Sequence, residues 1–385
     1  MSRIDLANSK ISRNFWTYFK PEKIWSATGV SKDLSAFKND RCSLLAGLLW
    51  QTITRENRFI GLSSEITSFV PANGDPVEIM LVTLTNISGL ELKFTPCAAI
   101  PIYGRSANNL RDHRHVTSLL NRIALNRFGV TLTPTLLFDE SAHKKNDTTY
   151  FVLGIDENKN YPEHIYPTQE TFCGDGGDLE APEAIYNNIL PDKNSLIQGK
   201  EAMAGLRFQE KKLSCRQSYT YIIVMGIASG NKNPQAIFAG FNSVEKIKLA
   251  LQETKAYWQE KSAEIKTDSS TSSFDNWLRW VNIQPALRRI LGCSFLPDFD
   301  YGKGGRGWRD LWQDCLALIL NHPEEIRTQI VNNFSGVRVD GSNATIIGQK
   351  PGEFIADRNA ITRVWMDHGV WPFTTTHLYI DQSGD

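Results

Sequence analysis

The chain has 385 residues, of which 41% are hydrophobic and 22% charged, a composition typical of a globular protein with two or three domains. Lys plus Arg and Asp plus Glu each number 42, so the net charge of zero gives no electrostatic reason to expect nucleic acid or a membrane as partner. No apolar run approaches the ~20 residues of a membrane helix, and the first residues lack the apolar stretch of a secretory signal. The six cysteines are scattered without a C-x-x-C pair, so we expect a cytoplasmic protein with no metal site.

Residues 1–241 show the alternation that predicts β-strands. In "PVEIMLVTLTN", apolar side chains fall on two opposite faces, one with Val77, Ile79 and Leu81 and the other with Met80, Val82 and Leu84. Similar β-branched or aromatic runs are "VTLTPTLLF", "TYFVLGI", "SYTYIIVMGIA" and "QAIFAGF", with polar, turn-rich connectors between them. Many short strands of this kind predict a large antiparallel β-sandwich, in a chain whose class is mainly β plus α.

The hydrophobic period changes to that of a helix near Asn242. Apolar positions then recur at spacings of three and four, at Val244, Ile247, Leu251, Thr254 and Trp258. Asn242 is placed to cap this helix, with Glu245 three residues later as in a capping box. A polar linker, "KTDSSTSS", separates it from a second predicted helix, "FDNWLRWVNIQPALRRILG". We therefore expect a β-sandwich domain at 1–241, a helical linker at 242–290 and a helical domain from 291 to 385.

The glycine-rich stretch "FDYGKGGRGWRDLWQDCLALIL" has the G-x-G-x-x-G spacing of a dinucleotide site at Gly302, Gly304 and Gly307. A dinucleotide fingerprint requires an apolar strand immediately before it, whereas "SFLPDFD" contains a proline and two aspartates. The stretch also lacks the G-K-[ST] of a phosphate-binding loop. Nucleotide binding is therefore excluded as the explanation of these glycines.

Asp310 and Asp314 lie four residues apart, on one face of the helix that follows the glycines. One interpretation is an arginine–aspartate network with Arg306 or Arg309 that closes the helix start. The other is a site for a polyhydroxylated ligand, in which Trp308 and Trp312 stack on sugar rings. Seven of the ten tryptophans fall in the last third of the chain, and the alternative for each is that it fills the core of a helical domain.

At these residues the sequence resembles the family 94 glycoside phosphorylases, the cellobiose phosphorylase group. The likeness covers nearly the whole chain from about Trp16 and is carried by "SFLPDFDYGKGGRGWRDLWQDCLALIL", "IWSATGVS", "TITRENRFIGLSSEITSFVP", "AAIPIYGRSANNLRDHRHVTSLLNR" and "TRVWMDHGVWPFTTTHLYIDQSGD". The resemblance implies an N-terminal supersandwich, a helical linker and the first helices of an (α/α)6 barrel that is incomplete within these residues.

The resemblance also implies a reaction, the reversible and inverting phosphorolysis of β-linked glucose oligosaccharides, with 1,2-β-oligoglucan as the best-matching substrate. Inorganic phosphate, a co-substrate rather than a cofactor, attacks the anomeric carbon while one aspartic acid protonates the leaving oxygen. The products are α-glucose 1-phosphate and a shortened oligosaccharide. In the family the general acid lies downstream of the matched region, so we assign no catalytic residue. We expect the chain alone to be inactive and the full-length protein to form a homodimer.

The same resemblance places the glucose-binding groups at the start of the predicted helix, where Arg306 and Asp310 grip the terminal sugar. The other predicted substrate-binding residues are Trp308, Arg309 and Asp314 beside them, and Trp365, Asp367 and His368 around "DHGVW". The basic segment "RSANNLRDHRHVTSLLNR" is expected to make a contact between domains rather than to bind metal. The segment "VDGSNATII", with Asp340, Ser342 and Asn343, is either a substrate-contacting loop or a plain turn.

Two other functions remain open from the sequence. One is a non-catalytic carbohydrate-binding or scaffolding protein. The other is the phosphorylase-like region of a cyclic β-1,2-glucan synthase.

Overall fold

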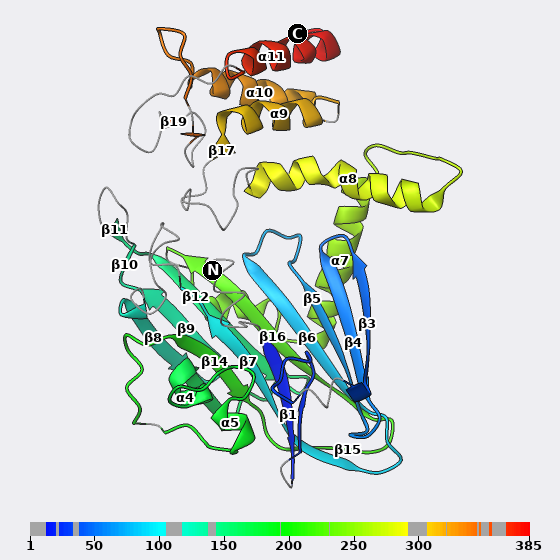
Figure 1. The fold of residues 1–385 in the computed structure, drawn as a ribbon, viewed down its shortest axis with the longest axis vertical. Coiled ribbons are helices and arrows are strands. Elements are labelled where there is room, and N and C mark those ends of the chain that lie inside the picture. Colours follow the sequence, from blue (N-terminus) through cyan, green and yellow to red (C-terminus); the bar gives the residue numbers. More distant parts are fainter. Residues whose placement is uncertain are drawn as a thin grey trace. The chain divides into compact units, whose positions relative to one another are not determined.

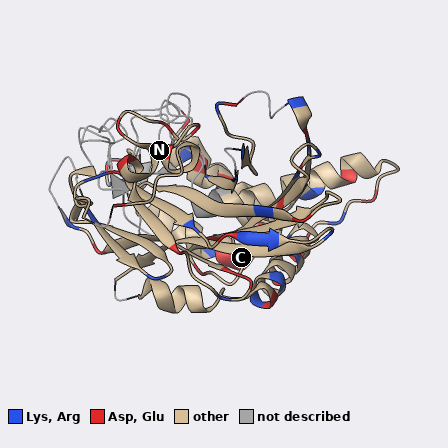
Figure 2. Cartoon of the chain, turned by 90° about the horizontal axis from the view of Figure 1, so that it is seen from below, with Lys and Arg blue, Asp and Glu red and all other residues tan. Residues whose placement is uncertain are grey.

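The computed structural model divides into two compact units, Met1–Trp258 and Gln259–Asp385, drawn as a ribbon in Figure 1. It describes residues 13–20, 23–33, 38–104, 118–137, 144–192, 194–230, 232–291, 306–320, 322–344, 346–347, 354–355 and 367–385. Figure 2 shows basic and acidic residues interspersed along the described ribbon, in keeping with the net charge of zero.

The first unit is built around two antiparallel β-sheets, which confirms the predicted sandwich. The bounds of its described strands are β1 (Asn14–Phe19), β2 (Lys23–Ser26), β3 (Asp40–Gly47), β4 (Trp50–Asn57), β5 (Leu62–Phe69), β6 (Val77–Asn86), β7 (Leu92–Ile102), β8 (Asn121–Asn126), β9 (Gly129–Pro134), β10 (Leu136–Leu137), β11 (Lys144–Lys145), β12 (Thr148–Asp156), β13 (His164–Thr168), β14 (Ala202–Arg207), β15 (Lys211–Leu213) and β16 (Ser218–Ser229). One sheet has eight strands in the order β3-β4-β5-β6-β16-β12-β9-β8. The other has six, in the order β13-β14-β7-β1-β2 with β15 beside β7, and β10 pairs separately with β11.

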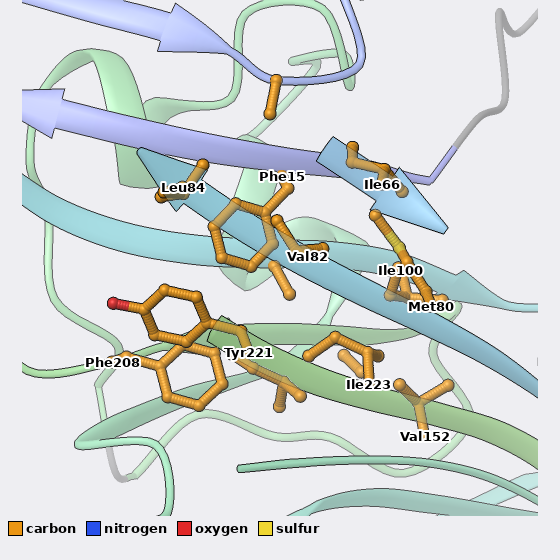
Figure 3. Close-up of a cluster of buried hydrophobic side chains, with 14 of the residues drawn as sticks. Phe15, Ile66, Met80, Val82, Leu84, Ile100, Val152, Phe208, Tyr221 and Ile223 are labelled. Atoms are coloured by element: carbon orange, nitrogen blue, oxygen red, sulfur yellow. The ribbon is translucent and has the colours of Figure 1, made fainter. Parts of the chain in front are cut away.

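Strand β6 is buried on both faces, as its sequence predicted. Met80, Val82 and Leu84 join the core that the two sheets enclose, together with side chains such as Phe15 and Tyr221 (Figure 3). Val77 and Ile79 point to the opposite face, where they pack with residues from the helices that cover the sheet. A strand that packs apolar side chains on both faces reads as a nearly continuous hydrophobic run.

The run "QAIFAGF" is a helix, so its prediction as a strand was wrong. It forms α6 (Pro234–Ala239), and the Asn233 side chain caps it by accepting from the backbone N–H of Gln235 at 2.8 Å. Pro234 occupies the first turn, where its missing N–H costs no hydrogen bond. Phe238 and Phe241 then pack onto the outer face of the eight-stranded sheet.

The predicted helix after the sandwich is present as α7 (Val244–Ser262). Val244, Ile247 and Leu251, the first three of the five predicted apolar positions, belong to the cluster on the outer face of the eight-stranded sheet. The capping residue was placed one position too early. Ser243 accepts from the backbone N–H of Lys246 at 3.3 Å, whereas the side chain of Asn242 accepts from the ammonium of Lys246 at 2.9 Å.

Two short helices, α4 (Gln169–Cys173) and α5 (Glu183–Tyr186), pack against the six-stranded sheet. Phe172 and Ile185 from these helices bury the outward-facing Trp16 and Cys97 of the sheet. Both faces of the six-stranded sheet are therefore covered in this region.

The second unit is helical in its described part. After α8 (Ser272–Leu291), its helices are α9 (Trp308–Leu318), α10 (Pro323–Phe334) and α11 (Val370–Ser383). Three two-residue strands form a small antiparallel sheet, β17 (Arg306–Gly307), β18 (Ile346–Ile347) and β19 (Phe354–Ile355). Helices α9, α10 and α11 pack side by side (Figure 1) around a core that includes Trp312, Ile330 and Tyr379. No helix among the described residues is both long enough and apolar enough to cross a membrane.

The segment after α10 forms a turn in its described part, as far as residue 344. The backbone N–H and the hydroxyl of Ser342 both donate to Asp340 Oδ1, at 3.0 and 2.6 Å. Gly341 adopts a φ of 79°, a left-handed conformation that glycine reaches without strain. The acceptor oxygen of Asp340 is thus engaged within the turn itself.

Candidate functional site at the start of helix α9

The candidate site begins at β17, which leads directly into α9. Arg306 pairs with Ile347 of β18, so the backbone immediately before the helix is fixed by a sheet. The side chain of Arg306 lies outside the described residues. Asp310 follows in the first turn of α9 and is half-buried. A carboxylate at this position is stabilised by the positive end of the helix dipole.

Trp308 and Trp312 are core residues of the helical unit. Both side chains are 0% exposed, and their rings meet edge to face with centroids 5.5 Å apart. Trp312 also packs against Phe334, at 5.3 Å between ring centroids. This is the core alternative that the sequence allowed for these tryptophans, and it leaves neither ring with a face on which a sugar could stack.

Trp308 also has a polar role. Its indole N–H donates to the backbone carbonyl of His368 at 3.0 Å. Because the indole is buried and its ring is packed against Trp312, this bond fixes the position of the backbone just before α11. The tryptophan therefore connects the first turn of α9 to the "DHGVW" segment.

Arg309 forms a two-pronged ion pair with Asp367. Its Nη2 lies 3.0 Å from Oδ1 and its Nε lies 2.6 Å from Oδ2. The indole N–H of Trp371, four residues along, donates to Oδ2 of the same carboxylate at 3.2 Å. The backbone carbonyl of Asp367 accepts from the N–H groups of Val370 and Trp371, so the turn that leads into α11 starts at this residue.

The electrostatic setting keeps Asp367 ionised. Desolvation acts to raise its pKa, but the hydrogen bonds from Trp371 and Arg309 outweigh this and hold the pKa below its ordinary value. A carboxylate that accepts hydrogen bonds from cationic and polar donors is favoured in its charged form. Asp367 therefore remains an anion throughout the neutral pH range.

His368 is buried beside these charges. Desolvation lowers its pKa below the ordinary value and is opposed first by the charge of Asp367, while Arg309 lowers the pKa and Asp310 raises it. The imidazole is therefore neutral at neutral pH, with one ring nitrogen as donor and the other as acceptor. The charge of Asp310 acts on the pKa of this imidazole in the same direction as the charge of Asp367.

The structure thus brings together five residues that the sequence predicted separately, namely Trp308, Arg309, Asp310, Asp367 and His368. Asp314 lies one turn further along α9 and is buried, with 3% of its surface exposed. Trp365 lies outside the described residues, as do residues 105–117 of the predicted basic segment. Trp371 belongs to the same predicted "DHGVW" segment, and its spacing of four from Asp367 is that of helical neighbours.

The described residues hold no cluster of three or more His, Cys, Asp or Glu side chains that could bind a metal ion. What they do provide is an anionic Asp310, a neutral His368 and an arginine–carboxylate pair. Side chains of this kind bind hydroxyl groups. The carboxylate accepts a hydrogen bond from a hydroxyl, and the neutral imidazole either donates or accepts one.

Comparison with known proteins identifies the larger unit. Residues 22–244 match the family described as glycosyl hydrolase 94, supersandwich domain. The chain belongs to glycosyl hydrolase family 94. The family recognised from the sequence motifs is thereby confirmed, and the match includes every described strand of the two sheets except β1.

Two curated relatives are similar to this family 94 chain. Cyclic beta-(1,2)-glucan synthase NdvB of Rhizobium meliloti (strain 1021) is 23% identical over 206 residues, which are 53% of this chain and 7% of the relative. N,N'-diacetylchitobiose phosphorylase of Vibrio proteolyticus is 25% identical over 117 residues, which are 30% of this chain and 14% of the relative. The chain thus spans a small part of the length of either relative.

Two solved structures share the fold of this family 94 chain. A bacterial glucoamylase complexed with acarbose aligns with 96% of this chain and 50% of its own, with a TM-score of 0.55 and 9% identity. A putative kojibiose phosphorylase from human microbiome aligns with 95% of this chain and 45% of its own, with a TM-score of 0.50 and 10% identity. Both therefore resemble the fold across the sandwich and the helices after it.

Proposed function

We propose that this chain is part of an inverting glycoside phosphorylase that acts on β-linked glucose oligosaccharides, with 1,2-linked glucan as the substrate. Family 94 membership supports the reaction class, since a chitobiose phosphorylase is among the relatives. The similarity to a cyclic β-(1,2)-glucan synthase supports the linkage. In this proposal residues 1–241 form the sandwich, 242–290 the linker and 291–385 the first helices of an (α/α)6 barrel.

The observation that carries the proposal is that Asp310 lies in the first turn of α9, where its neighbours Trp308 and Arg309 contact the segment of Asp367 and His368. Asp310 would accept hydrogen bonds from two hydroxyls of the terminal glucose, and the neutral imidazole of His368 would donate to or accept from a third. Arg306, whose backbone directly precedes the helix, would complete the sugar contacts. Asp314, buried one turn along α9, would support Asp310 from within the helical unit rather than touch the sugar.

The proposed reaction needs one general acid. Phosphate attacks the anomeric carbon from the face opposite the leaving group, and an acid protonates the departing glycosidic oxygen. Because phosphate is itself the nucleophile, no second carboxylate is required to activate water. Asp310 and His368 would stabilise the positively charged, flattened sugar of the transition state through its hydroxyls, and the acid would come from a part of the protein outside these residues.

The test uses the full-length protein that contains this chain, incubated with 1,2-β-oligoglucoside with and without inorganic phosphate. Chromatography and an enzymatic assay should detect α-glucose 1-phosphate only when phosphate is present. Release of free glucose independent of phosphate would contradict phosphorolysis. Activity on cellobiose but not on the 1,2-linked substrate would contradict the linkage.

A phosphorylase-like region of a cyclic glucan synthase is the second candidate, favoured by the match to 206 residues of such an enzyme. In this second candidate, the full-length protein would elongate or cyclise glucan with glucose from an activated donor. Formation of cyclic glucan in the same assay, with the donor supplied, would favour it. Sugar binding without any product would favour the non-catalytic scaffold.

A further inference from the structure

Side chains of α9 and α11 make three contacts with Asp367 and His368, the residues just before α11. Trp308 donates to the carbonyl of His368, Arg309 pairs with the carboxylate of Asp367, and Trp371 donates to that same carboxylate. Two of these contacts come from neighbouring residues in the first turn of α9, next to Asp310. One contact holds the backbone of His368 directly, and the other two hold the carboxylate of Asp367, the residue before it.

We infer that Arg309 and Asp367 form a positioning latch that sets His368 against the sugar bound by Asp310. The latch consists of these two residues, with Trp371 as the additional donor. The inference rests on the proposed function, because it assigns a role in sugar binding to His368. It also changes the role predicted for Arg309 and Asp367, from residues that touch the substrate to residues that orient the one that does.

The geometry of the latch is suited to orientation. Arg309 donates one hydrogen bond to the carboxylate of Asp367, through Nη2, and its Nε lies in ion-pair contact with the second carboxylate oxygen. A planar guanidinium that meets both oxygens restricts the angle between the two elements more than a point charge does. Here the contacts are Nη2 to Oδ1 at 3.0 Å and Nε to Oδ2 at 2.6 Å. The indole N–H of Trp371 prevents the carboxylate from rotating away, since it binds Oδ2 at 3.2 Å.

A purely stabilising role is a poorer account of this pair. The side chains of Arg309 and Asp367 are 43% and 40% exposed, and ion pairs this open to solvent contribute little to stability. The burial of Trp308 and Trp312 already joins α9 to the rest of the helical unit. What the ion pair adds is a defined place for the chain between Asp367 and the first turn of α11.

The helical unit contains a matched control. Arg327 of α10 pairs through Nε with Oδ2 of Asp385 at 2.7 Å, and the two side chains are 61% and 47% exposed. This pair also joins one helix to a segment flanking α11, at the opposite end of that helix. It has no contact with the residues of the candidate site in the described structure, so its loss measures what an exposed arginine–aspartate pair is worth for stability alone.

The experiment compares Arg309→Lys, Arg309→Met and Asp367→Asn with Arg327→Met in the full-length protein. We expect the latch variants to lose roughly ten- to a hundredfold in kcat/KM for phosphorolysis, mainly through KM, because the misplaced imidazole weakens sugar binding. Arg309→Lys should not retain the wild-type kcat/KM, since lysine keeps the positive charge but makes only one contact with the carboxylate. Melting temperatures of all four variants should stay within about 4 °C of one another.

The outcomes separate the latch from the proposed function. Wild-type kcat/KM in Arg309→Lys, or an equal loss in Arg327→Met, would overturn the latch while leaving the reaction in place. An inactive wild-type protein would overturn the proposed function. The latch would then be tested on the 385-residue chain by NMR of the histidine ring protons. The signal of His368 is assigned by its disappearance in His368→Asn. A moved His368 signal in Arg309→Met but not in Arg327→Met supports the latch, and an unmoved signal in both contradicts it.

Discussion

At the scale of single residues, Asp310 is the side chain on which the proposed sugar site depends most directly. It is half-buried in the first turn of α9, where its charge acts on the buried His368. Replacing it by asparagine keeps the shape and removes the charge. Because hydrogen bonds to a charged acceptor contribute about 1.5–3 kcal/mol, Asp310→Asn should lower kcat/KM in the full-length enzyme by roughly ten- to a hundredfold.

The control for this substitution is Asp381→Asn. Asp381 is an exposed aspartate of α11, 3.4 Å from Nε2 of His377, away from the start of α9. Its removal should leave the steady-state kinetics unchanged. Equal kinetics for both variants would remove Asp310 from the site.

A second residue-scale prediction concerns the buried ion pair of the sandwich. Asp40, with a side chain 3% exposed, lies 3.1 Å from Nη1 of Arg55 and also accepts from Asn57 at 2.6 Å and Trp25 at 3.2 Å. Asp40→Ala leaves the guanidinium buried without its counter-charge, and such a loss costs about 3–5 kcal/mol. Urea unfolding monitored by circular dichroism should show this loss of unfolding free energy.

The control is Lys93→Met, which removes an exposed ion pair with Glu210 and should lower the free energy of unfolding by less than about 1 kcal/mol. Similar midpoints for the two variants would show that the Asp40 network contributes little.

At the scale of secondary-structure elements, the start of α7 supplies a test of one hydrogen bond. Ser243 accepts from the backbone N–H of Lys246, whereas Asn242 contacts only the exposed ammonium of the same residue. Ser243→Ala should therefore lower the free energy of unfolding by about 1 kcal/mol, the usual contribution of a cap. Asn242→Ala should cost a few tenths of that, as exposed contacts do. The opposite order in urea unfolding would restore Asn242 as the cap, as the sequence pattern suggested.

The elements also show what sequence patterns can and cannot decide. Strand β6 was predicted with both faces correct, because alternation over ten residues is unambiguous and both faces are buried. The run that became α6 was misassigned, because a short apolar stretch fits either period and only Asn233 and Pro234 before it signal a helix. The pairing of Arg309 with Asp367 was out of reach, since the two lie 58 positions apart and nothing local specifies their contact.

At the scale of the whole molecule, each compact unit has hydrophobic cores of its own. Three clusters lie in the sandwich unit as far as Ile247, and one joins α9, α10 and α11. The sequence predicted this order of sandwich and helices, and family motifs identified it, but the tryptophans of the helical unit show the limit of composition alone. Trp308 and Trp312 suggested sugar platforms and are instead the largest side chains of a core.

The cysteines allow the two units to be followed separately. Cys97 and Cys173 are buried in the sandwich unit, where burial raises the pKa of both thiols to about 12, and Cys315 is buried in the helical unit. Cys42 and Cys215 are exposed. Under native conditions an alkylating reagent should therefore modify Cys42 and Cys215 rapidly and the three buried thiols slowly, as peptide mass spectrometry can measure.

Alkylation across a urea series then reports the unfolding of each unit. If the cores unfold independently, Asp40→Ala should shift the reactivity midpoints of Cys97 and Cys173 to lower urea, by about 1 M or more. The midpoint of Cys315 should stay at its wild-type value, because its core lies in the other unit. A common shift of all three thiols would mean that the units unfold as one cooperative body. In that case a substitution in the sandwich would change the fraction of molecules in which the site at α9 is folded. The kinetics of the site variants would then have to be compared between proteins of equal stability.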